Sequence, residues 1–239
     1  MTAVAERSTA SPARTRRPGA ILTVLLLGQF MAILDVSIVN VAAPTLRADL
    51  HASGAGLQLS VAGYTITYAV LLITGARLGD RIGHGYAFRY GLVGFTLASL
   101  ACGLAPNTGT LIAFRMVQGA GAALMMPQVM SLIQRTFDGT ARARALSLYS
   151  AVIAGGAVVG QVLGGVIVSA DLFGTGWRPV FLVNVPIGVA LSLLAVRDLP
   201  ADRGQRNRGL DPAGVVTLSA AVLLLVVPLV LGHEEHWPV

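Results

Sequence analysis

Seven long apolar runs dominate this chain of 239 residues and restrict what it can fold into. Each approaches or exceeds the roughly 20 residues with which a helix crosses the hydrocarbon core of a bilayer. Within that core a helix satisfies its own backbone hydrogen bonds, so runs of this length indicate transmembrane helices. The runs are Ala20–Ala43, Gln58–Arg77, Tyr86–Ala105, Thr110–Leu132, Ala145–Ser169, Val180–Val196 and Ala213–Leu231.

The composition agrees with a membrane location. Charged residues make up only 12% of the sequence, hydrophobic residues make up 54%, and the mean hydropathy is +0.72. Soluble domains carry about 25% charged residues. The fold class predicted from the residues is therefore an all-α integral membrane protein.

The basic residues predict the orientation of these helices. The net charge is +6 and all 17 basic residues are arginines, spread too thinly to form a nucleic-acid-binding face. Because cytoplasmic loops retain positive charge, the side that carries 14 of them is predicted to be cytoplasmic, together with the N-terminus. These 14 are Arg7, Arg14, Arg16, Arg17, Arg77, Arg81, Arg89, Arg135, Arg142, Arg144, Arg197, Arg203, Arg206 and Arg208. The opposite connections hold only Arg47 and Arg178, and seven spans would leave Val239 outside.

The first run has features of a signal peptide, because arginines precede it and small residues occur near its end. It is longer than the usual apolar segment of a signal peptide and six further runs follow, which favours an uncleaved helix. Residues 1–18 form a polar tail without apolar periodicity, and the stretch 198–211 is a second polar segment. We expect the first to be disordered and the second to be a linker.

Two ionisable residues fall inside apolar runs, where a charge costs several kcal/mol unless it is paired or hydrated. Asp35 lies in the first run and Arg115 in the fourth. A buried carboxyl group can take up and release protons, and a nearby arginine can tune it or bind anions. The alternative is a purely structural pair, in which Arg115 or Asn40 satisfies Asp35 and Arg115 fastens two helices together.

Two glycine patterns have both a functional and a structural interpretation. Between the second and third runs, Gly79 and Gly83 allow a tight cytoplasmic turn in which Asp80 and Arg81 can bond helix termini. This turn could equally be an ordinary positively charged loop. In the fifth run, glycines four residues apart create a flat face for close helix packing, which is either a static seam or a face that slides during gating. They are Gly156, Gly160 and Gly164, with Gly155 and Gly165 beside them.

Several classes of protein are disfavoured by what the sequence lacks. It contains no lysine and no phosphate-binding loop of the GxxxxGK[ST] type, so ATP is not an expected energy source. It has no HExxH or GxSxG signature, so we do not expect an enzyme. The single Cys102 and four scattered histidines offer no metal-ligand spacing, so no metal site is expected either.

Five segments together resemble the N-terminal half of a major facilitator superfamily transporter, specifically the 14-helix drug:proton antiporters of EmrB/QacA type. The resemblance covers about residues 20–231. The segments are LDVSIVNVAAPTL (34–46), ARLGDRIG (76–83), RMVQGAGAA (115–123), GAVVGQVLGG (156–165) and WRPVFLVNVPIG (177–188).

The resemblance implies roles for individual residues. Asp35 stands at the family's membrane-embedded acidic position and Arg115 at its helix-four arginine, so the two are implied to couple proton and substrate movement. The implied cytoplasmic loop gate contains Arg77, Gly79, Asp80, Arg81, Gly83 and Arg89. The helix-five antiporter motif contains Gly156, Gly160, Gln161, Gly164 and Gly165. Candidates for the substrate cavity are Asn40, Tyr64 and Gln118.

The sequence departs from the family pattern at five places. Ala76 replaces the first glycine of the loop motif and His84-Gly85 its usual basic pair, which lowers the local charge. Gln161 replaces the usual proline of the helix-five motif, so bending of that helix is in doubt. Leu59 and Pro179 stand where tryptophan and an aromatic residue are common. These departures weaken any inference about the substrate.

The resemblance implies a major facilitator fold: a disordered cytoplasmic tail (1–18), a six-helix transporter half (19–197), a cytoplasmic linker (198–211), and a seventh helix with a truncated end (212–239). The expected function is proton-coupled efflux of small amphipathic or cationic drugs through the cell membrane. No cofactor is expected, because the proton gradient supplies the energy. The lipid bilayer and a missing C-terminal half are expected partners. The alternatives are a metabolite facilitator or importer, and a non-transporting truncated membrane protein.

Overall fold

The computed structural model describes residues 17–171, 174–202 and 204, together with 214, 217 and 220–224. Its helices are α1 (Pro18–Asp49), α2 (Gly54–Ile82), α3 (His84–Gly103), α4 (Thr108–Thr136), α5 (Gly139–Ala170), α6 (Pro179–Leu182) and α7 (Asn184–Asp198). The predicted tail 1–18 lies outside the described residues except for Arg17 and Pro18. Most of the seventh predicted run, Ala213–Leu231, also lies outside them, although its described residues are helical.

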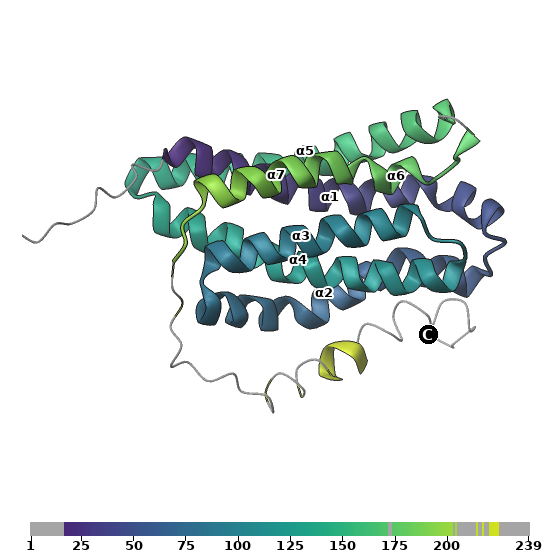
Figure 1. Cartoon of the computed structure of the whole chain (residues 1–239), viewed down its shortest axis with the longest axis horizontal. Helices are drawn as coiled ribbons and strands as arrows, with labels where there is room; N and C mark the ends of the chain where they lie inside the picture. The colour runs from purple at the N-terminus through teal and green to yellow at the C-terminus, as the bar shows by residue number, and fades with distance from the viewer. Residues whose placement is uncertain are drawn as a thin grey trace, which may run out of the picture.

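The helices run alternately up and down, so the α2–α3 turn, the α4–α5 turn and the end of α7 lie at the same end as the start of α1 (Figure 1). This end holds every described arginine of the set predicted to be cytoplasmic. Local signals fix where two helices begin: the Ser53 Oγ accepts from the Gly56 N–H at 3.1 Å before α2, and the Asn107 Oδ1 accepts from the Thr110 N–H at 2.9 Å before α4.

Five of the described helical segments are long and apolar enough to cross a membrane. They are α1, α2, α4, α5 and the combined segment Pro179–Asp198. The third predicted run corresponds to α3, which has 20 residues but is not among the five. Its first turns contain His84 and Arg89, which lower its hydropathy.

Two helices differ in extent from the predicted runs. The first run was predicted to end at Ala43, but α1 continues through Pro44 to Asp49. Membrane helices tolerate a proline when neighbouring groups satisfy the freed backbone. The sixth run, predicted as one helix, is divided at Val183 into α6 and α7. Pro186 lies in the first turn of α7 and has no N–H to donate back to the preceding turn, which favours a division here.

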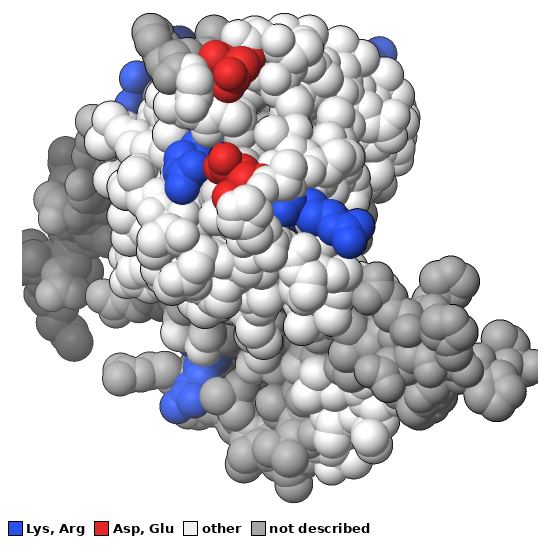
Figure 2. All heavy atoms as spheres, turned by 90° about the vertical axis from the view of Figure 1, so that its right-hand side faces the viewer, with Lys and Arg blue, Asp and Glu red and all other residues white. Residues whose placement is uncertain are grey.

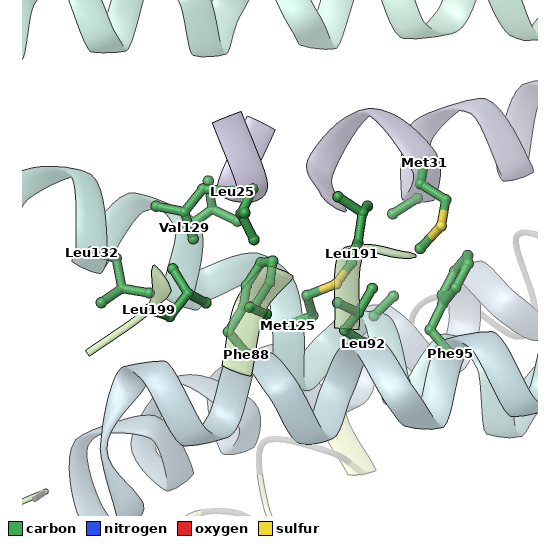
Figure 3. Close-up of a cluster of buried hydrophobic side chains, with 14 of the residues drawn as sticks. Leu25, Met31, Phe88, Leu92, Phe95, Met125, Val129, Leu132, Leu191 and Leu199 are labelled. Atoms are coloured by element: carbon green, nitrogen blue, oxygen red, sulfur yellow. The ribbon is translucent and has the colours of Figure 1, made fainter. Parts of the chain in front are cut away.

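The helices pack as two groups: α4 lies between α2 and α3, while α1 lies against α5 and contacts α7. Glycines allow the close approach of α4 to its neighbours, because a Cβ on Gly75 would collide with the Ala123 backbone and one on Gly119 with the Tyr64 backbone. The interior is filled by a cluster of aliphatic and aromatic side chains from α1, α3, α4 and α7 (Figure 3). Its largest members include Leu25, Phe88, Phe95 and Met125.

At the opposite end, an acidic residue at the end of α1 holds the start of α6. The Trp177 Nε1 donates to Asp49 Oδ2 at 2.9 Å, and the Arg178 Nη1 donates to the same oxygen at 3.2 Å. The guanidinium of Arg178 also lies over the Trp177 ring, 4.9 Å from its centroid. Figure 2 shows this end, where acidic and basic atoms lie together within a largely uncharged surface.

Candidate functional site

A buried ion pair joins α1 to α4 in the interior of the bundle. Asp35 is 0% exposed and Arg115 is 1% exposed. The Nη1 of Arg115 donates to Asp35 Oδ2 at 2.5 Å. The two charges that the sequence places inside apolar runs are therefore in direct contact, and each offsets the cost of burying the other.

Two side-chain amides complete the hydrogen bonding of the Asp35 carboxylate. The Nε2 of Gln118 and the Nδ2 of Asn184 each donate to Asp35 Oδ1 at 2.9 Å. Gln118 lies three residues after Arg115 on α4, and its Oε1 accepts from Arg115 Nη1 at 2.8 Å. Both carboxylate oxygens thus accept hydrogen bonds, and Asn184 connects the site to the start of α7.

The Arg115 guanidinium is held on its other sides by α2 and α6. Its Nε donates to the Ser60 carbonyl oxygen at 3.2 Å, which uses a backbone group of α2. Its Cζ lies 4.7 Å from the centroid of the Tyr64 ring and 5.6 Å from that of the Phe181 ring. Aromatic faces attract a guanidinium, so these rings stabilise the positive charge of Arg115 without replacing its hydrogen bond to Asp35.

This arrangement depends on both charges. Ionised Asp35 is stabilised by one cation and two amides. Removing the charge of either partner would leave the other buried without its counter-charge, which is costly. Among the described residues, no group of three or more His, Cys, Asp or Glu side chains is placed to hold a metal ion.

The structure corrects one sequence hypothesis and adds residues that it missed. Asn40 was considered as a partner for Asp35, but its Nδ2 donates to the Val36 carbonyl at 3.0 Å and the residue is exposed. Five residues after Asp35, it lies on a different face of α1. Asn184 and Ser99 were not predicted, because a neutral polar side chain inside an apolar run costs less than a charge and stands out less. A neutral amide within the run around Asn184 was the available, weaker signal.

The predicted cytoplasmic turn is as tight as its glycines suggested. Gly83 alone separates α2 from α3 and has φ +102°, which favours glycine. A Cβ on Gly79 would collide with the Gln128 side chain of α4. The Gln128 side chain in turn hydrogen-bonds His84, with 2.7 Å between Oε1 and the His84 Nδ1. The Nε2 of His84 lies 3.5 Å from Asp80 Oδ1, beyond good hydrogen-bond distance.

The other predicted loop residues separate into two groups. Arg89 binds the C-terminal end of α7: its Nε donates to the Ala195 carbonyl at 2.9 Å and its Nη2 to the Leu199 carbonyl at 2.6 Å. Arg77 and Arg81 are exposed. Asp202, which was not predicted, accepts hydrogen bonds from the first backbone N–H groups of α3, at 3.2 Å from His84 N and 3.0 Å from Gly85 N.

The helix-five glycines form a packing face against α1. Gly156, Gly160 and Gly164 are buried, and a Cβ on Gly160 would collide with Ser37 and with the Leu34 backbone. Gln161 is exposed, and a Cβ on Gly165 would meet nothing within 4 Å. The motif therefore divides into residues that touch α1 and residues that face away from it.

Several named proteins are similar in sequence to this chain over nearly its whole length. The chain is 43% identical over 229 residues to the "Probable actinorhodin transporter" of Streptomyces coelicolor, covering 96% of this chain and 40% of that protein. It is 40% identical to the "Cephamycin export protein CmcT" of Amycolatopsis lactamdurans, covering 97% and 48%. It is also 40% identical to the "Methylenomycin A resistance protein" of Streptomyces coelicolor, covering 95% and 47%. The chain thus spans less than half the length of these relatives.

Solved structures share the fold at low sequence identity. A bacterial homologue of the human lysosomal transporter Spinster, in an inward-facing and occupied conformation, superposes with a TM-score of 0.67 at 22% identity, over 79% of this chain and 46% of that one. The peptide transporter POT in complex with sulfate gives 0.65 at 16% identity, over 91% and 47%. The sequence profile described as "Major Facilitator Superfamily" matches residues 25–233. The predicted all-α membrane fold is thereby confirmed: this chain belongs to the major facilitator superfamily, whose members are multi-pass membrane transporters.

Proposed function

We propose that the chain is the N-terminal half of a 14-helix drug:proton antiporter of EmrB/QacA type. Its cargo is a small amphipathic or cationic compound of the antibiotic class, exported across the cell membrane, with the N-terminus in the cytoplasm. Named relatives that are exporters and resistance proteins support the direction and the class of cargo. The arginines at one end of the bundle support the orientation.

The observation that carries the proposal is the completely buried Asp35 carboxylate, bonded to Arg115, Gln118 and Asn184. A proton from outside neutralises Asp35 and weakens its bond to Arg115. Release of this proton to the cytoplasm restores the ion pair. Drug movement outward is coupled to this cycle because the two states differ in charge and in packing at the centre of the bundle. The proton gradient supplies the energy, and no cofactor takes part.

The other motifs have supporting roles in this proposal. The turn around Gly83, with Asp80 and the exposed Arg77 and Arg81, belongs to the cytoplasmic gate. The glycine face of α5 slides against α1 as the two halves move. Tyr64 and Gln118, which contact Arg115, are the proposed substrate-cavity residues, and Asn40 lies on the exposed face of α1. The missing C-terminal half completes the cavity from the other side.

The Asp35→Asn variant tests the proposal. A fluorescent cationic dye is added outside everted membrane vesicles that contain the chain together with its C-terminal continuation, and dye uptake is measured once the vesicle interior is made acidic. Asp35→Asn keeps the shape of the side chain but cannot carry the proton, so we expect proton-dependent transport to fall by at least about tenfold. Asp138→Asn is the matched control, because the Asp138 side chain is 93% exposed.

Each outcome distinguishes the alternatives. Equal transport by Asp35→Asn and wild type would contradict the assignment of Asp35. Transport that persists after an uncoupler collapses the gradient would indicate a facilitator or importer. If vesicles containing only the 239-residue chain transport dye, the C-terminal half is not required. If neither preparation transports any cargo tested, a non-transporting membrane protein is the better interpretation.

A further inference from the structure

Asn184 holds an unpartnered oxygen atom beside the buried charge. Its side chain is completely buried, and its Nδ2 donates both to Asp35 Oδ1 at 2.9 Å and to Ser99 Oγ at 3.1 Å. Its Oδ1 has no hydrogen-bond partner among the residues that the structure describes. Leaving a buried carbonyl oxygen unpartnered costs free energy. The charge of Asp35 explains this orientation of the Asn184 amide, because the opposite orientation would place the amide oxygen next to a carboxylate oxygen and the two would repel.

Protonation of Asp35 would leave this site with one donor too many. As a carboxylate, Asp35 accepts N–H groups from Arg115, Gln118 and Asn184. A protonated carboxyl group instead presents an O–H that needs an acceptor. Arginine has no acceptor atom, and the Oε1 of Gln118 already accepts from Arg115 Nη1 at 2.8 Å. The unpartnered Oδ1 of Asn184 belongs to a side chain that already touches Asp35.

We propose that Asn184 is a hydrogen-bond switch that responds to the charge of Asp35. When Asp35 takes up a proton, the amide makes a half turn about its Cβ–Cγ bond, and its Oδ1 accepts the acid O–H where Nδ2 donated before. The terminal torsion of asparagine is broad, so the turn requires no backbone movement. Both N–H groups of Nδ2 then leave their partners, Asp35 and Ser99, and the new bond from the acid O–H to Oδ1 drives the exchange. This inference rests on the proposed proton site at Asp35.

The switch extends to the junction of α6 and α7. The Ser99 Oγ accepts from Asn184 and donates to the Phe181 carbonyl oxygen at 2.9 Å. Once the Asn184 oxygen faces Ser99, the Ser99 hydroxyl can donate to it instead and release the Phe181 carbonyl. Phe181 lies in the last turn of α6, and only Val183 separates this helix from α7. Asn184 therefore acts as a positioning residue that connects proton binding to the sixth span.

The groups around Asp35 favour Asn184 as the acceptor. The ionisable neighbours that interact with Asp35 are Arg115 from α4, Tyr64 from α2 and Cys102 from α3. The Cys102 Sγ lies 3.8 Å from Gln118 Oε1 and is directed to that atom. Tyr64 presents its ring to Arg115, and within the described part of the chain its hydroxyl also has no hydrogen-bond partner. Tyr64 is thus the competing acceptor, and the experiment must distinguish it from Asn184.

Infrared difference spectroscopy tests the switch without requiring transport. The 239-residue chain is purified in nanodiscs with ¹³C-labelled asparagine, and spectra at alkaline pH are subtracted from spectra at acidic pH. The sequence has four asparagines: Asn40, Asn107, Asn184 and Asn207. We expect the carbonyl band of one labelled asparagine amide to shift to lower wavenumber as the carboxylic acid band of Asp35 appears. The acid band is assigned by its loss in unlabelled Asp35→Asn.

Variants assign the asparagine band and identify the acceptor. Asn184→Ser should abolish the shift, and Asn40→Ser should leave it unchanged. Ser99→Ala removes one of the two donors to the turned oxygen, so the shift should become smaller. This variant provides a second measurement if Asn184→Ser does not fold. If Tyr64→Phe abolishes the shift while Asn184→Ser keeps it, the tyrosine is the acceptor and the proposal is wrong.

The proposed proton site at Asp35 and the proposed switch at Asn184 would be contradicted by different results. If the acid band appears but no asparagine band moves, Asp35 binds protons without Asn184 as a switch, and only this inference is overturned. If no acid band assignable to Asp35 appears at any pH, the proposed proton site fails as well. Correlated appearance of the acid band and a shift that Asn184→Ser abolishes supports both.

Discussion

Two helix pairs of this bundle are joined in opposite ways. Helix α5 lies against α1 through glycines: Gly156, Gly160 and Gly164 touch side chains and backbone of the facing helix. Among the described residues of these two helices, no hydrogen bond or ion pair crosses the contact. Helix α7 instead meets α3 through hydrogen bonds near its start and at its end. Asn184 donates to Ser99, and Arg89 donates to the last carbonyls of α7.

The difference concerns how each contact resists sliding. Close packing without directional bonds changes little in energy when one smooth surface moves along another, provided that the separation is kept. Hydrogen bonds at both ends of a helix fix its position along its axis, because a shift of one residue breaks all of them. The α1–α5 contact is therefore suited to movement, whereas the α3–α7 contact is suited to holding the sixth span in place.

The largest effect is expected from breaking the smooth contact with Gly160→Leu. A Cβ at this position would already meet Ser37 and the Leu34 backbone, and a whole leucine side chain would force α5 away from α1. Overpacking of this kind costs about 3 kcal/mol, at the upper end of the usual range. The measurement is thermal unfolding of the protein purified in detergent, where the midpoint should fall markedly.

Gly165→Leu is the matched control for this prediction. It adds the same side chain five residues further along α5, where a Cβ meets no described atom within 4 Å. Its unfolding midpoint should stay close to that of the wild type. Equal destabilisation by both variants would mean that contact with α1 does not set the role of Gly160, because the higher helix propensity of leucine favours both variants.

A smaller effect is expected from loosening the fixed contact with Arg89→Gln. Glutamine is too short to reach the carbonyls of Ala195 and Leu199, so the end of α7 loses its charged cap. Hydrogen bonds from charged groups contribute about 1.5–3 kcal/mol, and we expect a loss near the lower value because the site is only partly buried. The free energy of unfolding and the rate of amide hydrogen exchange at the end of α7 measure this loss.

Arg81→Gln serves as the comparison, since Arg81 lies on the same turn region but is exposed. It should change neither the unfolding midpoint nor the exchange rates of α7. If the two arginine variants behave alike, the general loss of positive charge at this end, and not the cap on α7, explains the result.

The sequence predicts the smooth contact better than the fixed one. Glycines four residues apart in an apolar run indicate a face for close helix packing, and the structure confirms such a face on α5. The sequence alone does not say that α1 is the partner, because several helices could accept the same surface. The division of the sixth span at Val183 was not predicted, since the apolar run continues through it and only Pro186 indicates a change.

The candidate site, too, could be predicted only in part from the sequence. Asp35 and Arg115 could be predicted because burying a charge inside an apolar run costs free energy, so such residues are rare there. Asn184 and Ser99 are neutral, and nothing in their spacing says that they meet Asp35 from helices far along the chain. Asp202 is hidden for a different reason. It lies in a polar linker where an aspartate is ordinary, and only the fold brings it to the start of α3.

The smallest effect is expected at this linker contact. The Asp202 carboxylate accepts from the first two N–H groups of α3 and places negative charge at the positive end of the helix dipole. Asp202→Ala should cost about 1 kcal/mol, as for other lost N-terminal caps. Asp202→Asn should cost less, because its amide oxygen can still accept one of the two bonds. Hydrogen exchange at His84 and Gly85 should quicken in the same order. If both variants match the wild type, Asp202 does not cap α3.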